Sequence, residues 1–172
     1  MNTKTFALLF GIVFLAVGAL GFVPGMVHMP PADPHDVTMT QGYGDLLGLF
    51  PVNLLHNLVH LLFGVWGLIA AKSLPAAKGY AKSVAIIYAI LMVMGLISAG
   101  NLHTTFGLIP LYGHDVWLHL GTAILAAYLG WRSVVEIERR AAERVDRREQ
   151  TIPVEKERRL GHSDRRIPGS EV

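Results

Sequence analysis

The sequence predicts an all-α fold: a four-helix transmembrane bundle, followed by a cytoplasmic helical extension and a disordered tail. Three observations predict it: 52% of the residues are hydrophobic and only 16% charged, four long stretches are apolar, and the cations cluster at alternate connections. Soluble domains typically hold about 25% charged residues, because charges keep their surfaces hydrated. We therefore expect a membrane domain over residues 1–135 and a charged cytoplasmic segment over 136–172.

The four apolar stretches cover residues 6–23, 53–71, 81–98 and 116–135. Each is close to the roughly 20 residues that a helix needs to cross a hydrocarbon core. A helix also satisfies its own backbone hydrogen bonds, which lipid cannot do. The first stretch has a second interpretation as a signal peptide with Lys4 in its charged region. Its apolar part is long for that role and ends at Pro24 and Gly25, so we favour an uncleaved span.

The cations set the expected orientation. Lys4 precedes the first stretch, Lys72, Lys78 and Lys82 surround the connection at 72–80, and the tail is rich in Arg. The loops at 24–52 and 99–115 contain no Lys or Arg. Because cytoplasmic loops carry the excess of cations, both termini are expected in the cytoplasm.

The connections differ in composition. The outer loop at 24–52 is rich in Pro and Gly, and its residues 45–50 are apolar enough to lie along the membrane surface. Residues 133–150 are expected to continue as an exposed helix, supported by opposite charges four residues apart, as in Glu136/Arg140, Glu143/Arg147 and Arg139/Glu143. From Thr151 onward Pro and Gly interrupt any periodicity, which favours disorder. The tail's mixed charges argue against a lipid-binding basic patch, and no nucleic-acid signature is present.

The candidate site is a polar cluster on the outer side. On a helical wheel the polar and small residues of the second stretch share an arc of about 100°, and these are Asn53, His56, Asn57, His60, Gly64, Gly67 and Ala71. Helices in lipid turn such residues toward one another, so this arc should point into the bundle. Asp115 and His119 start a similar stripe on the fourth stretch.

The histidines admit two interpretations. Of eight, all except His162 fall on the outer side of the expected topology. They could hold haem or a divalent metal through His56, His60 and His119, since neutral imidazole is a common metal ligand. Alternatively they hydrogen-bond asparagines and loop carbonyls and hold the outer loops on the bundle. We favour the structural role, because the chain has no Cys and no ligand set that defines a metal geometry.

The second stretch also resembles a known family. Residues 47–50, Leu-Gly-Leu-Phe, and 52–61, Val-Asn-Leu-Leu-His-Asn-Leu-Val-His-Leu, with Gly64, look like the signature of a bacterial four-helix membrane family of unknown function, DUF4383. Residues 6–24 and 110–130 resemble its first and last spans. The resemblance implies a membrane location, with the inner membrane of a bacterium expected, and implies no activity.

We therefore expect a non-enzymatic scaffold or interaction protein in the lipid bilayer, with a structural or pH-responsive histidine cluster. Its partners would be a second copy of the chain or another membrane protein. The alternative is a haem- or metal-binding membrane protein. A weaker alternative is an oligomeric transporter or channel, because four helices form a pore only as an oligomer.

Overall fold

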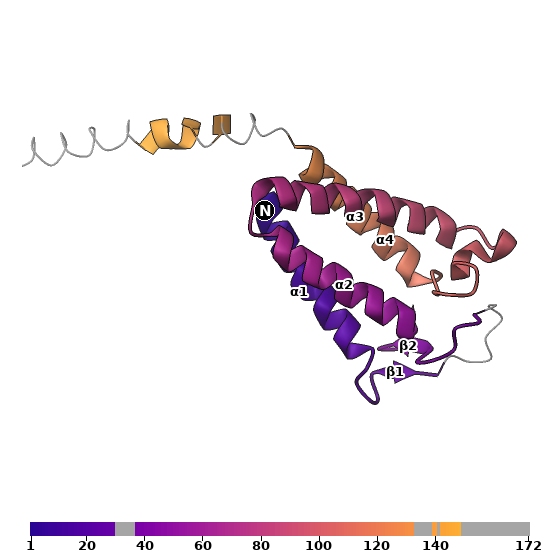
Figure 1. Cartoon of the computed structure of the whole chain (residues 1–172). Coiled ribbons are helices and arrows are strands. Elements are labelled where there is room, and N and C mark those ends of the chain that lie inside the picture. The colour runs from indigo at the N-terminus through magenta and orange to yellow at the C-terminus, as the bar shows by residue number, and fades with distance from the viewer. Residues whose placement is uncertain (30–36, 133–138, 141, 149–172) are drawn as a thin grey trace, which may run out of the picture. The chain divides into compact units, whose positions relative to one another are not determined.

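The computed structural model describes residues 1–29, 37–132, 139–140 and 142–148, and the chain divides into two compact units, Met1–Trp131 and Arg132–Val172. The first unit is mainly helical (Figure 1), with the α-helices α1 (Thr3–Leu20), α2 (Leu54–Ala70), α3 (Leu74–Gly95) and α4 (His114–Trp131). The shorter elements are the 3-10 helix η1 (Ala99–Thr104) and the strands β1 (Val27–His28), β2 (Gly44–Leu46) and β3 (Phe50–Val52).

Capping residues set the ends of the helices, and these ends differ from the ends of the apolar stretches. The side chain of Asn2 accepts a hydrogen bond from the backbone N–H of Thr5 at 2.7 Å, so α1 begins before its apolar stretch. Ser73 caps α3 in the same way, and Pro75 suits the first turn because its missing N–H has no helical partner there. The expected connection at 72–80 is therefore wrong: α3 already begins at Leu74.

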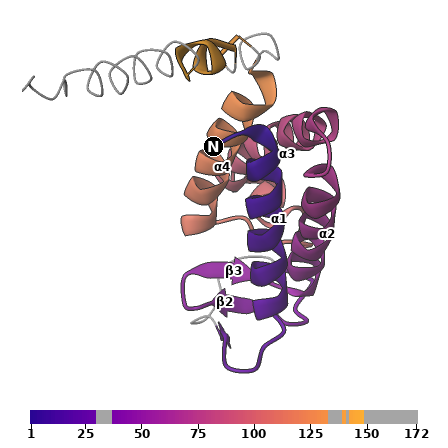
Figure 2. The same ribbon diagram turned by 90° about the vertical axis from the view of Figure 1, so that its left-hand side faces the viewer.

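The four helices pack mainly as two pairs, α1 with α2 and α3 with α4 (Figures 1 and 2). Glycine allows the first pair to approach closely. A Cβ atom built on Gly67 of α2 would lie 2.8 Å from the Cα atom of Gly11 in α1. Such small-residue contacts between backbones are a common way for membrane helices to associate.

The two pairs are joined at the end that contains the N-terminus and the α2–α3 turn. There Phe6, Tyr80, Val84 and Leu129 form part of a shared core, and each is almost completely buried. The hydroxyl of Thr3 donates to the carbonyl oxygen of Leu129 at 3.1 Å, which links the start of α1 to the end of α4. Toward the other end the pairs diverge (Figure 1), and the connecting loops lie there.

A small sheet corrects the expectation of an all-α fold. Strands β1, β2 and β3 form an antiparallel sheet in that order, with Val27 opposite Leu46 and Gly44 opposite Val52. The apolar segment at 45–50 is thus mainly a β-hairpin, and its turn contains Leu47 with a φ of +56°. Strands of two or three residues leave almost no alternation in the sequence, and Pro51 argues against a strand, so the sheet could not be predicted.

Two helices, α1 and α3, are long and apolar enough to cross a membrane, and α2 is a shorter apolar helix. In the second unit, residues 139–140 and 142–148 are helical, and the expected ion pair between Arg139 and Glu143 is formed at 2.7 Å. The expected tail from Thr151 to Val172 lies outside the described residues.

Candidate functional site

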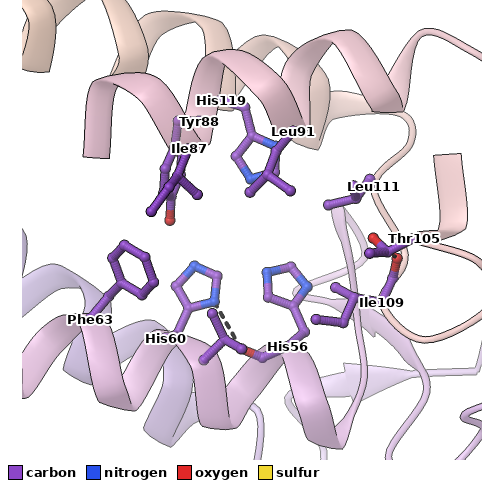
Figure 3. Close-up of a pocket in the computed structure, with 11 residues that line it drawn as sticks. His56, His60, Phe63, Ile87, Tyr88, Leu91, Thr105, Ile109, Leu111 and His119 are labelled. Carbon is purple, nitrogen blue, oxygen red and sulfur yellow. Dashed lines mark hydrogen bonds between the residues drawn. The ribbon is translucent and has the colours of Figure 1, made fainter. Parts of the chain in front are cut away.

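The polar arc of α2 is divided between two neighbours. Asn57 lies against Gly21, just after α1, and Gly64 and Gly67 also contact α1. His56 and His60 are directed instead toward the space between α2 and the α3–α4 pair (Figure 3). The arc is wide enough for both, because an arc of about 100° on a helix can touch two adjacent helices.

Asn53 joins α2 to the loop that contains Met39 and to the loop that contains Leu108. It is fully buried and caps α2, since its side-chain oxygen accepts the backbone N–H of His56 at 2.9 Å. Its side-chain nitrogen donates to the carbonyl oxygens of Met39 at 3.0 Å and Leu108 at 2.7 Å. One side chain thus satisfies groups from the helix and from two loops far apart in sequence.

His56 and His60 are held by backbone carbonyl groups. The Nδ1 atom of His56 lies 3.1 Å from the carbonyl oxygen of Pro51, and Nδ1 of His60 lies 3.1 Å from that of His56. Their rings stack with centroids 4.5 Å apart and an interplanar angle of 28°. Since a carbonyl oxygen only accepts, each ring has its hydrogen on Nδ1 and a lone pair on Nε2.

Asp115 and His119 form a buried pair on α4, and both are about 3% exposed. Nε2 of His119 lies 3.5 Å from Oδ2 of Asp115. Within the described residues, neither Nδ1 of His119 nor Oδ2 of Asp115 has a hydrogen-bond partner. The His119 ring packs edge-on against Tyr88 of α3, with centroids 4.8 Å apart. The polar atoms of this pair are therefore less completely hydrogen-bonded than those of the histidines of α2.

These side chains surround a cavity of about 160 Å³ between α2 and the α3–α4 pair. Figure 3 shows His56 and His60 on one side, His119 and Tyr88 on the facing side, and the loop residues Thr105, Ile109 and Leu111 at one end. The remaining lining residues are apolar, and they are Val59, Phe63, Ile87 and Leu91. The structure thus brings His56, His60 and His119 around one cavity and leaves Asn53, Asn57 and Asp115 outside its lining.

The other histidines lie apart from this cavity. His28 is exposed in β1, His103 is in η1, and His114 is the first residue of α4. His35 and His162 lie outside the described residues.

The comparison with protein families matches residues 4–132 to the domain of unknown function DUF4383. The chain belongs to this family. The resemblance seen in the residues of the second stretch is thereby confirmed. The comparisons with curated proteins and with solved structures found no match.

For this DUF4383 chain, metal and haem fit the geometry poorly. Within the described parts of the chain, no group of three His, Asp or Glu side chains is placed to hold a metal ion. An apolar cavity of about 150 Å³ holds a single benzene ring, so the cavity of about 160 Å³ is too small for the macrocycle of haem. The helix pairs would have to separate to admit it.

Sequence reasoning missed Tyr88 and the loop residues that close the cavity. Tyr80, Val84 and Tyr88 repeat at helical spacing and are buried along α3, so this stripe was a usable signal. The sequence gives no such signal for Thr105, Ile109 and Leu111, because their positions depend on an irregular loop that includes positive φ angles at Thr105 and Phe106.

Proposed function

We propose that this DUF4383 protein is an integral membrane protein with four spans and both termini in the cytoplasm of a bacterial cell. Its role is non-catalytic: it acts as a scaffold or interaction protein in the lipid bilayer. The supporting observation is that all four helices expose large apolar side chains on their outward faces.

These outward side chains are at least about two-fifths exposed, and they include Leu8, Leu9, Ile12 and Val13 of α1, Leu58, Leu62, Val65 and Ile69 of α2, Ile86, Ile90 and Val93 of α3, and Trp117, Leu118, Ile124 and Tyr128 of α4. Soluble monomers rarely expose contiguous apolar patches beyond a few hundred Å². Lipid is the surrounding that matches such a surface on every helix.

The lengths of α2 and α4 are compatible with this proposal. They have 17 and 18 residues, at the lower end of the roughly 17–25 residues seen in transmembrane helices. Lys82 lies close to Trp131, with its Nζ atom 5.5 Å from the ring centroid. A Lys and a Trp together are typical of a membrane–water interface.

The charge distribution supports the orientation. The end of the bundle that contains the N-terminus and the α2–α3 turn also contains Lys4, Lys72 and Lys78. The opposite end contains the loops without Lys or Arg. The positive-inside rule therefore favours a cytoplasmic location for the first end.

The polar groups support a non-catalytic role. Asn53 and His56 bind backbone groups of the outer loops, and none of the described residues that line the cavity is a carboxylic acid. The described parts of these loops are thereby held on the bundle, where a second copy or another membrane protein could contact them.

Reporter fusions test the proposal. Fusions after residues 40 and 108 should report an external location, and those after 77 and 150 a cytoplasmic one, in cells whose membrane fraction contains the protein. A cytoplasmic signal from either outer loop, or recovery of the chain in the soluble fraction, would contradict it. A visible spectrum and elemental analysis of the purified protein test the haem or metal alternative at His56, His60 and His119.

A further inference from the structure

The cavity combines apolar walls with a set of hydrogen-bond acceptors. His56 and His60 each use their ring N–H on a backbone carbonyl oxygen, so their Nε2 atoms carry lone pairs. Both residues line the cavity from the side of α2 (Figure 3).

The third histidine also lines the cavity, and its Nδ1 atom is buried without a hydrogen-bond partner among the described residues. Nε2 of His119 lies 3.5 Å from Oδ2 of Asp115, but that oxygen also has no hydrogen-bond partner among these residues, so the contact does not fix which ring nitrogen carries the hydrogen. Buried polar atoms without a partner are rare and costly, so this nitrogen beside a cavity indicates a missing hydrogen-bond partner.

The size of the cavity limits what could supply that hydrogen-bond partner. A dry cavity of about 150 Å³ accepts benzene, and this one measures about 160 Å³. Phe63 and Tyr88 pack edge to face against each other, with ring centroids 6.2 Å apart at 70°, and together line one part of the cavity. Aromatic rings prefer aromatic neighbours in such arrangements, so a flat ring packed against them is a suitable occupant.

We propose that this cavity binds one neutral six-membered ring carrying a hydroxyl group, as in a phenol or a quinol. The hydroxyl donates to Nε2 of His56 or His60, and the ring occupies the cavity and packs against Phe63, Ile87 and Tyr88. This binding site goes beyond the proposed scaffold role and needs no metal.

The residues at the rim of the cavity indicate a route by which a ligand could enter from lipid. Val59 is exposed, and Ile87 and Leu91 are partly exposed on the α2 and α3 sides of the cavity. Only this route rests on the proposed membrane location. Binding measured in detergent does not depend on the orientation of the chain, so failure of one proposal leaves the other standing.

Fluorine NMR of the purified full-length protein in detergent tests the proposal, with para-fluorophenol as the probe and fluorobenzene as the matched ring without a hydroxyl. Empty micelles give the background partitioning. Ile87→Trp fills the cavity, and Ile86→Trp adds the same bulk at a neighbouring side chain that is 53% exposed. His60→Leu removes one acceptor at similar volume.

We expect saturable binding of para-fluorophenol by the wild type and by Ile86→Trp, and none by Ile87→Trp. Fluorobenzene should bind about fivefold more weakly, as should para-fluorophenol to His60→Leu, because one hydrogen bond is worth about 1 kcal/mol. No saturable binding to the wild type, or equal binding of both probes, would overturn the proposal. These two results come from the wild type, so they stand even if Ile87→Trp fails to fold.

Discussion

Gly67→Ala tests whether the contact between α1 and α2 depends on the absence of a side chain. A Cβ atom at this position would lie 2.8 Å from the Cα atom of Gly11, 2.9 Å from the carbonyl oxygen of Ala7 and 3.0 Å from the hydroxyl of Tyr80. Two of these atoms belong to the backbone of α1, so they cannot rotate away. The helices must therefore separate or bend.

The expected magnitude follows from these distances. Carbon atoms in ordinary contact are about 3.5 Å or more apart, so the shortfall at the Cα atom of Gly11 is about 0.7 Å. Overpacking of this kind typically costs about 1–3 kcal/mol of unfolding free energy. The intrinsic preference of helices for Ala over Gly opposes this by about 1 kcal/mol.

Gly121→Ala is the matched control. It lies in α4, and apart from the nearby backbone of that helix no heavy atom of the described residues lies within 4 Å of a Cβ built there, so it reports the helix preference alone. Thermal unfolding in one detergent should place Gly67→Ala roughly 2–12 °C below Gly121→Ala, from about 2–4 °C per kcal/mol for a chain of this size. If Gly67→Ala melts at or above the temperature of the control, the close packing of α1 on α2 is wrong.

Three further experiments test other parts of the molecule. Asn53→Ala should lower the unfolding free energy by about 1–3 kcal/mol and increase hydrogen exchange at residues 38–39 and 107–108. Asn53→Ser should keep the cap of α2 and lose only the contacts to the two loops. Equal protection from exchange in the wild type and both variants would contradict this. His60→Gln and His60→Leu should each cost less than about 1 kcal/mol, because the partner is a carbonyl within α2; a larger loss of stability in detergent for Leu alone would show that His60 supports a further group. Deletion of residues 151–172, which lie beyond the family match at 4–132, should leave a monodisperse protein by gel filtration, and aggregation would show that the tail supports the bundle.

The sequence by itself determined the number of long helices, their approximate places and the family. These depend on local information: a run of apolar residues of sufficient length, and a motif around His56 and His60, are visible without knowledge of any neighbour. The helix ends shifted by several residues, as at Leu74, because a cap such as Ser73 sets the end and hydropathy does not.

The tertiary structure alone decided which helix each face contacts. The arc of α2 is continuous in the sequence, yet Asn57 faces α1 while His60 faces the cavity, because the two helix pairs pack closely within themselves and diverge from each other. His119 and Tyr88 line the same cavity as the histidines of α2 because the helix pairs diverge and because the loop that contains Leu111 closes one end of the cavity. Such contacts join residues far apart in the chain, so only the packing of the helices in space determines them.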